Sequence, residues 1–417
     1  MSSSTKPEHT PPKVAVIATV DMSLRYMLLN QMLFLRQAGY AVCGISAPGP
    51  ETAAVTQAGI PYHPAALTRS FSPLADLRAL GQIYRILRRE RPTIVHTHTP
   101  KAGLLGQLAA RLAGVPVVLN TVHGFYFHER TPPLQRRFYI ALESVAARCS
   151  DTIFSQNRED IATAVREQIA PAARLKYLGN GFDLEAFDRA PLGPAVLAEK
   201  RRELGLAPGA PVVGFVGRLV AEKGILELLA AGQAVRQRFP EVRFLIVGPI
   251  DPDKPDSLSP AVARDYNLAD ACIFTGRRAD MPQLYALMDV LVLPSHREGF
   301  PRTPMEASLM GVPSVVTDVR GCREAVEHER NGLVVPFGDV DALAAAIGQV
   351  LADPALARRL GAAGRQMARE RFDERRVFQA VCDEYARLLA ARGIPAPGAS
   401  PEQRVRAQPE PAGEAGG

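Results

Sequence analysis

Asp289-Val-Leu-Val-Leu-Pro-Ser295 is followed after two residues by Glu298-Gly-Phe-Pro-Arg-Thr-Pro-Met-Glu306. The apolar run predicts a buried strand, and Thr-Pro in the second stretch predicts the start of a helix. The two glutamates stand eight positions apart, with the second in the opening turn of that helix. A strand, a loop bearing a carboxylate and a helix N-terminus together suit the binding of a sugar and its phosphates.

The same residues also fit a purely structural interpretation. Thr303, Pro304 and Glu306 match a capping box, in which Thr303 is the N-cap and Glu306 reaches back to it. Glu298 would then be an ordinary solvated loop residue. This stretch alone leaves both interpretations open.

Strand-like and helix-like patterns alternate along the chain, which predicts the α/β class with parallel, doubly wound sheets. About twelve strands are too many for one open sheet, so we expect two Rossmann-like domains. The predicted strands are Lys13–Val20, Tyr40–Ser46, Thr93–Thr97, Val115–Thr121, Thr152–Ser155, Leu175–Tyr177, Val212–Val216, Arg243–Val247, Cys272–Thr275, Val290–Pro294, Ser314–Thr317 and Leu333–Pro336.

The expected domain boundaries follow from the places where this alternation of strands and helices is interrupted and restarts. We expect an N-terminal domain over 13–187 and a C-terminal domain over 188–372, with a helix at 373–392 packing back on the first. Residues 1–12 and 393–417 are expected to be disordered from their polar or Pro- and Gly-rich composition. Ligands of such sheets bind outside the carboxyl ends of the strands, which predicts a cleft between the two domains.

The bulk composition is that of an ordinary globular enzyme, with 417 residues, 47% hydrophobic and 22% charged. The net charge of +6, from 42 Arg and 7 Lys, suits an anionic ligand or surface, and no nucleic-acid-binding pattern occurs. Five scattered cysteines form no Cys-x-x-Cys pair, which favours a reducing, cytoplasmic setting. The sequence contains no signal-peptide pattern and no apolar run of about 18 residues that would span a membrane.

A second candidate site follows the strand Val212–Val216, where the chain reads Gly217-Arg218-Leu-Val-Ala-Glu-Lys223-Gly224 and then becomes helical. An Arg and a Lys beside a helix N-terminus suit a diphosphate. The alternative is that both cations pair with Glu222 and Glu227 at the surface. After Cys272–Thr275, a polar loop that includes Arg277 either holds a nucleotide base or ends in Asp280 as a helix N-cap.

Histidines end two strands of the first half, at His96-Thr97-His98 and at His123-Gly124. Metal ligation is a weak interpretation, because no acidic residue lies at ligand spacing. Hydrogen bonding to a sugar hydroxyl or phosphate is favoured for His123, and a packing role for His96. Asn180-Gly181 is predicted to form a turn at the floor of the cleft.

The order and spacing of several short motifs carry a family resemblance. Along the chain these motifs are His123-Gly124, Gly217-Arg218, Glu222-Lys223-Gly224, Glu298 with Glu306, and Asn331-Gly332-Leu-Val-Val-Pro336. Through them the sequence resembles the retaining glycosyltransferases of family 4, from Val14 to about Arg387. The resemblance implies the GT-B fold, two Rossmann-like domains facing across a cleft. The implied donor-binding residues are Arg218, Lys223, Arg277, Glu298, Gly299, Phe300, Pro301 and Glu306.

The resemblance also implies individual roles. Arg218 and Lys223 would hold the donor diphosphate, Glu298 the transferred sugar and Glu306 the ribose, while His123 would sit over the donor sugar. The implied catalytic residues are therefore His123, Glu298, Arg218 and Lys223, and those on the acceptor side are His98, Lys101 and Asn180. One departure is the loop Thr19-Val-Asp21-Met-Ser23-Leu-Arg25, which lacks the glycine pair of many members.

The segments Val95–Gly103, Val122–Glu129 and Val319–Ala325 are similar to enzymes of bacterial surface-polysaccharide assembly. This similarity implies retaining transfer of a hexosyl or N-acetylhexosaminyl group from a UDP-sugar to a lipid-linked glycan, with no metal or cofactor required. Partners would be the nucleotide sugar and the glycan acceptor. A weaker hypothesis is contact with an anionic inner membrane surface through arginine clusters, for which an ordinary solvated face is the favoured alternative; the arginines are Arg85, Arg88, Arg89, Arg91, Arg136 and Arg137. The alternatives are a GT-B-fold nucleotide-sugar epimerase and a catalytically silent binding protein.

Overall fold

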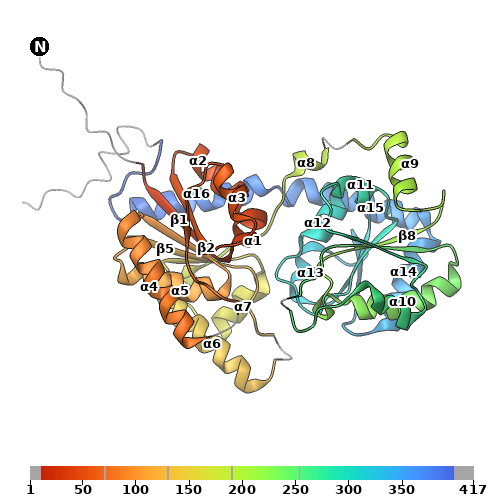
Figure 1. Ribbon diagram of the computed structural model, residues 1–417, viewed down its shortest axis with the longest axis horizontal. Coiled ribbons are helices and arrows are strands. Elements are labelled where there is room, and N and C mark those ends of the chain that lie inside the picture. The colour runs from red at the N-terminus through yellow and green to blue at the C-terminus, as the bar shows by residue number, and fades with distance from the viewer. Residues whose placement is uncertain (1–10, 70–71, 129–130, 189–190, 253, 399–417) are drawn as a thin grey trace, which may run out of the picture. The chain divides into compact units, whose positions relative to one another are not determined.

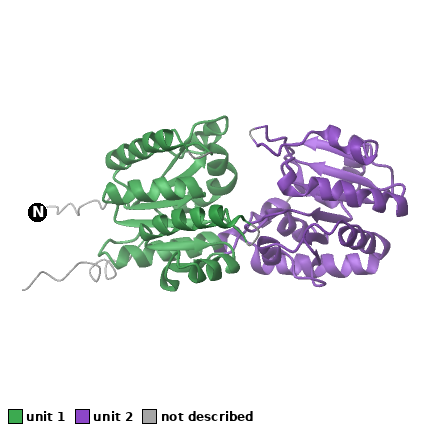
Figure 2. Cartoon of the chain, turned by 90° about the horizontal axis from the view of Figure 1, so that it is seen from below, with its two compact units in different colours: residues 1–178, 377–417 green, residues 179–376 purple. Residues whose placement is uncertain are grey.

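The computed structural model describes residues 11–69, 72–128, 131–188, 191–252 and 254–398 (Figure 1). The chain forms two compact units, one reaching to Leu178 and resuming at Val377, the other spanning Gly179–Arg376 (Figure 2). The second unit thus begins at Gly179, where the sequence suggested a boundary after residue 187. Of the segments expected to be disordered, residues 1–10 and 399–417 lie outside the described residues.

The first unit is built on a seven-stranded parallel sheet of order β3-β2-β1-β4-β5-β6-β7. Its strands are β1 (Lys13–Val20), β2 (Ala41–Ala47), β3 (Tyr62–Pro64), β4 (Ile94–His98), β5 (Val117–Val122), β6 (Thr152–Ser155) and β7 (Leu175–Tyr177). The sequence missed β3, which pairs with β2 at the edge of the sheet. This strand has three residues and ends in a proline, so it lacks the apolar run that marks buried strands.

Helices cover both faces of this first sheet. The first-unit helices are α1 (Asp21–Ser23), the π-helical turn η1 (Leu24–Leu28), α2 (Leu29–Gln37), α3 (Thr52–Gln57), α4 (Pro73–Glu90), α5 (Pro100–Leu112), α6 (Pro133–Arg148), α7 (Arg158–Arg166), the 3₁₀ turn η2 (Ala172–Arg174) and α16 (Glu374–Ala390). One face packs against α4 and α5, and the other against α2 and α16. Helices α4, α5 and α6 lie side by side (Figure 1).

The second unit contains a six-stranded parallel sheet of order β10-β9-β8-β11-β12-β13. Its strands are β8 (Val212–Val216), β9 (Arg243–Val247), β10 (Cys272–Gly276), β11 (Val290–Leu293), β12 (Ser314–Thr317) and β13 (Gly332–Val335). Its helices are α8 (Leu184–Asp188), α9 (Pro194–Glu203), η3 (Ala221–Lys223), α10 (Ile225–Arg238), η4 (Pro260–Tyr266), α11 (Met281–Ala286), α12 (Arg302–Leu309), α13 (Arg320–Ala325), α14 (Val340–Ala352) and α15 (Pro354–Arg371). The predicted pair of doubly wound, Rossmann-like sheets is confirmed.

The order of this second sheet reverses between β8 and β11, which are neighbours although β9 and β10 intervene in the chain. Such a switch point is where ligands bind in open α/β sheets, because the loops leaving the two strands diverge there. Both stretches singled out from the sequence, at Arg218–Lys223 and at Glu298, leave the sheet at this point.

Two glycines pack the loops at this edge closely together. A Cβ on Gly224 would lie 2.0 Å from the carbonyl oxygen of Pro294, and φ at Gly224 is +77°. A Cβ on Gly321 would lie 2.6 Å from the carbonyl of Glu298. The starts of α10 and α13 therefore pack directly against the backbone of the Pro294–Glu298 loop and fix its path.

Within the part of the chain that the structure describes, no single helix has the length and apolarity to cross a membrane. The pair α14 and α15, bent by 98°, meets that test of length and composition only when the two helices are taken together.

Candidate active site

Lys223 and Glu298 meet at the switch point of the second sheet. The Nζ atom of Lys223 lies 2.6 Å from Oε1 of Glu298, and the hydroxyl of Ser295 donates to the same oxygen at 2.7 Å. The side chain of Glu298 is 9% exposed and that of Lys223 20%. Within the described residues no partner is bonded to Oε2 of Glu298. The cation and one carboxylate oxygen are thus fixed, while the second oxygen is available to a ligand.

Arg218 follows β8 directly and contributes a second cation at the same edge. Its Nη1 atom lies 2.7 Å from Oδ2 of Asp251, and about a third of its side chain is exposed. The surface pairing considered from the sequence does not occur. Instead Glu222 bonds to Arg297 at 2.9 Å, and Glu227 lies 2.6 Å from Nε2 of His296.

Glu306 lies in α12, and the capping-box interpretation of it is wrong. The helix begins at Arg302 with Pro301 as the N-cap, and Oγ1 of Thr303 has no hydrogen-bond partner among the described residues. Pro304 fits inside the first turn because its missing N–H is one that would lack a helical partner anyway. The hydroxyl of Tyr285 donates to Oε2 of Glu306 at 2.8 Å. Burial raises the pKa of Glu306, an effect opposed by Arg302 and by this hydrogen bond.

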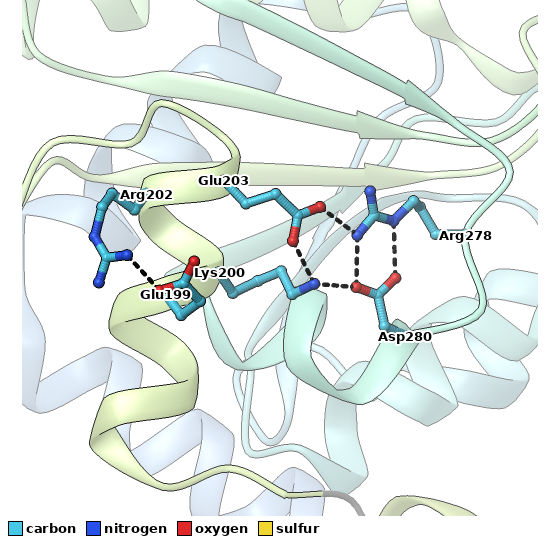
Figure 3. Close-up of polar contacts among 6 residues, drawn as sticks. All are labelled: Glu199, Lys200, Arg202, Glu203, Arg278 and Asp280. Carbon is cyan, nitrogen blue, oxygen red and sulfur yellow. Dashed lines mark hydrogen bonds and ion pairs between the residues drawn. The ribbon is translucent and has the colours of Figure 1, made fainter.

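The polar loop after β10 is held by ion pairs rather than by a helix cap. Asp280 occupies the N-cap position of α11 but makes no side-chain cap bond. Its carboxylate lies 2.6 Å from Arg278 and 2.7 Å from Lys200 of α9, and Glu203 bonds both cations (Figure 3). Hydrogen bonding to Arg278 holds the pKa of Asp280 well below its usual range. Arg277 lies beside this network with its side chain exposed.

The loop from Gly299 to Pro301 joins these two parts of the site. The ring of Phe300 packs in the core against Phe372, with centroids 5.9 Å apart, so only the backbone of Phe300 can line a ligand site. Asn180, which the sequence placed on the acceptor side, belongs to the second unit and donates to the carbonyl of Phe300 at 2.9 Å. Asn180 therefore fixes the donor-side loop.

In the first unit, the buried His98 and the partly buried His123 form a hydrogen-bonded chain. His98 Nδ1 lies 3.1 Å from His123 Nε2, and His123 Nδ1 lies 3.0 Å from Oε1 of Gln156. His96 bonds to Tyr385 and Thr121, in agreement with the packing role expected for it. Burial lowers the pKa of His123 to about 4 and that of His98 well below its usual range, so both are neutral at pH 7.

These contacts change the predicted first-unit site. Both ring nitrogens of His123 are engaged within the unit, while Nε2 of His98 is buried and has no hydrogen-bond partner among the described residues. Lys101, expected on the acceptor side, is 5% exposed and is held by Asp76 at 2.5 Å and Thr68 at 2.6 Å. Lys101 therefore joins α5 to α4.

Sequence reasoning missed three residues that shape these sites. Ser295 and Tyr285 hold the two glutamates, and Gln156 fixes His123. Ser295 lies inside the quoted stretch and was within reach of sequence analysis. The other two come from distant elements, so only the fold reveals them. Glu143 of α6 was also missed. It lines a small pocket beside Pro100 and Tyr126, and burial raises its pKa to about 7.

Two family profiles match the chain, one in each unit. "Glycosyl transferase 4-like domain" matches residues 27–181, and "Glycosyl transferases group 1" matches residues 197–367. The residues that the second profile matches include Arg218, Lys223, Glu298 and Glu306.

Individual relatives agree with these matches. The chain is 34% identical over 294 residues to an Escherichia coli UDP-Gal:alpha-D-GlcNAc-diphosphoundecaprenol alpha-1,3-galactosyltransferase, covering 70% of this chain and 74% of that protein. It is 27% identical to the Staphylococcus aureus capsular polysaccharide biosynthesis glycosyltransferase CapM, covering 90% and 97%. The structure of Anabaena Alr3699/HepE in complex with UDP and glucose shares the fold, with a TM-score of 0.75 at 22% identity over 90% of this chain and 100% of that one. The chain therefore belongs to the group 1 glycosyl transferases, as a GT-B glycosyltransferase of the family 4 type found in bacterial surface-polysaccharide assembly.

Proposed function

We propose that the protein transfers a hexosyl or N-acetylhexosaminyl group from a UDP-sugar to a hydroxyl of a lipid-linked glycan, with retention at the anomeric carbon. The observation that carries this proposal is the Lys223–Glu298 pair at the switch point of the second sheet. It is supported by a relative whose name gives UDP-Gal and a diphosphoundecaprenol-linked sugar as its substrates.

Lys223 and Arg218 would neutralise the diphosphate as it leaves. Negative charge grows on the leaving group in the transition state, and cations fixed in advance stabilise it without reorganisation. Lys223 is held by Glu298 and Arg218 by Asp251, so both are positioned before the donor binds. The N-terminus of α10, which begins at Ile225, adds positive potential. With these charges in place, the proposed reaction needs no metal ion or cofactor.

The glutamates would divide the rest of the donor between them. Oε2 of Glu298 would accept from a hydroxyl of the transferred sugar, with the backbone of Gly299, Phe300 and Pro301 beside it. Glu306 would accept from the ribose hydroxyls, and the Arg277 loop would contact the base. We propose a front-face displacement, the route expected from the resemblance to the retaining glycosyltransferases of family 4.

The first unit would receive the acceptor. His98 and His123 end neighbouring strands of that sheet and form a neutral, hydrogen-bonded pair. His123, which is partly exposed while Nε2 of His98 is buried, is the member of this pair that would contact a sugar. Lys101 and Asn180 are not part of this proposed acceptor site, because their contacts are internal.

An assay with UDP-, GDP- and ADP-sugars and a polyprenyl-diphosphate-linked sugar acceptor tests the proposal. We expect transfer from a UDP-sugar only in the presence of acceptor, with nuclear magnetic resonance showing the same anomeric configuration in donor and product. Inversion at that carbon would contradict the proposed mechanism. Release of an epimer without acceptor would support the epimerase alternative instead.

An exposed apolar rim favours a membrane-bound acceptor. Leu74 and Leu77 begin α4, and Leu134 and Phe138 begin α6; these four side chains are 52–85% exposed. Helix starts lie at the same edge of a parallel sheet as the strand ends that carry His98 and His123. Arg78 and Arg137 are exposed within the rim. We therefore propose that this rim, rather than the arginines at the far end of α4, contacts an anionic bilayer at the cytoplasmic face.

Flotation with liposomes of anionic phospholipid tests this surface. The wild-type protein is expected to float at low salt, and Leu134→Ser with Phe138→Ser to lose that association, because each apolar side chain contributes roughly 1.5–3 kcal/mol of burial. Arg88→Gln with Arg89→Gln is the matched control and is expected to float normally. Failure of the wild-type protein to float at low salt would remove the membrane from the proposal.

A further inference from the structure

Tyr285 is the one side chain among the described residues that donates a hydrogen bond to Glu306. Its hydroxyl lies 2.8 Å from Oε2, and the tyrosine is fully buried. It lies in α11 and reaches Glu306 in α12 across 21 positions of sequence. Removing this hydroxyl would leave a buried carboxylate oxygen without its donor, which orients and stabilises the ionised form.

The hydrogen bond makes the two oxygens of Glu306 unequal. Oε2 accepts a hydrogen bond from Tyr285, whereas Oε1 forms an ion pair with Nε of Arg302 at 3.6 Å and accepts no hydrogen bond among the described residues. The side chain of Glu306 is 15% exposed, so it is accessible to a ligand over a small area. A carboxylate oxygen has two lone-pair positions and can accept from two neighbouring hydroxyls only if the group is held in one orientation.

Tyr285 is itself held by its surroundings. Its ring belongs to a buried cluster with Leu284 and Met288, and it lies 6.2 Å from the ring of Phe187. Helix α11 begins after Asp280, whose carboxylate is fixed by Arg278 and by Lys200 of α9 (Figure 3). The ion-pair network therefore anchors the start of the helix that carries Tyr285.

We propose that Tyr285 positions Glu306 so that Oε1, which accepts no hydrogen bond from the described residues, recognises the 2′- and 3′-hydroxyls of the donor ribose, and that Tyr285 thereby sets the preference for ribonucleotides over 2′-deoxyribonucleotides. This inference rests on the proposed function, in which Glu306 binds the ribose. Tyr285 is a positioning residue in this arrangement, since its hydroxyl bonds to Glu306.

The test compares the binding of UDP and 2′-deoxy-UDP by titration calorimetry in the full-length protein. The wild-type protein is expected to prefer UDP by roughly 10- to 100-fold, the strength of a hydrogen bond to a charged group. Glu306→Gln is expected to lose most of this preference. Tyr285→Phe is expected to lose most of it as well, although the carboxylate is still present. Tyr385→Phe, which removes another buried phenol hydroxyl in the first unit, is the matched control and is expected to keep the preference.

The outcomes distinguish a failure of the role proposed for Tyr285 from a failure of the proposed function. If Glu306→Gln keeps the preference for UDP, the ribose role in the proposed function is wrong. If Glu306→Gln loses the preference and Tyr285→Phe keeps it, only the role of Tyr285 is overturned. If Tyr285→Phe does not fold, Asp280→Asn provides the second test, because it loosens the start of α11. A folded Asp280→Asn protein with unchanged preference would contradict the inference.

Discussion

Lys223→Ala is expected to lower the rate of sugar transfer by about 10²–10³-fold, the usual loss for one fixed electrostatic donor in an active site. The ammonium of Lys223 lies at the switch point and is oriented by Glu298 at 2.6 Å. In the proposed reaction it faces the diphosphate, where negative charge develops. Steady-state kinetics with a UDP-sugar and a lipid-linked acceptor measure the change.

The same substitution also removes the partner of a nearly buried carboxylate. Breaking such a pair costs about 3–5 kcal/mol of stability when the remaining charge stays buried. Thermal unfolding therefore has to accompany the kinetics, which are measured well below the unfolding temperature of the variant. Lys13→Ala, which removes a more exposed pair with Glu90 in the first unit, is the control and should leave transfer unchanged. Near-normal turnover by folded Lys223→Ala would contradict the assignment.

Glu298→Gln is expected to abolish most transfer while UDP still binds. Amide and carboxylate have the same shape, so the fold should persist, but a neutral amide accepts a weaker hydrogen bond from a sugar hydroxyl. The amide oxygen can still accept a hydrogen bond from Lys223, and Arg218 and Glu306 are unaltered, so calorimetry should show UDP affinity lowered far less than transfer.

The matched control for this second prediction is Glu222→Gln, which alters a glutamate of the neighbouring loop that bonds to Arg297. We expect it to have a small effect on transfer. If Glu298→Gln transferred sugar at the wild-type rate, Glu298 would be an ordinary loop residue that serves only to pair with Lys223.

The sequence predicted the strand–loop–helix units of the second sheet well, because buried parallel strands are continuous apolar runs with clear ends. β8, β9 and β12 have the bounds that the pattern indicated. The start of α12 was misplaced by two residues, since Thr303-Pro304 resembles a cap whether or not the helix begins earlier. The edge strand β3 was missed because it is short and partly exposed.

The side-chain partners were harder to predict than the elements. Lys101 and Asn180 are polar residues near strand ends, which is also where a ligand-binding residue would lie, and only the fold shows that their contacts are internal. The sequence predicted a helix from Leu24, but the chain is helical from Asp21, and a π-helical turn occupies Leu24–Leu28. Single-sequence patterns carry no signal for such a turn, which often marks a functional position.

A crystal structure of the protein with UDP bound tests the central claim most directly, because the claim is a position in the second sheet. We predict that the diphosphate oxygens lie within hydrogen-bond distance of Lys223 Nζ and the guanidinium of Arg218, with the ribose hydroxyls on Oε1 of Glu306. Well-ordered UDP bound away from the β8–β11 switch point, with the Lys223–Glu298 pair untouched, would contradict the account.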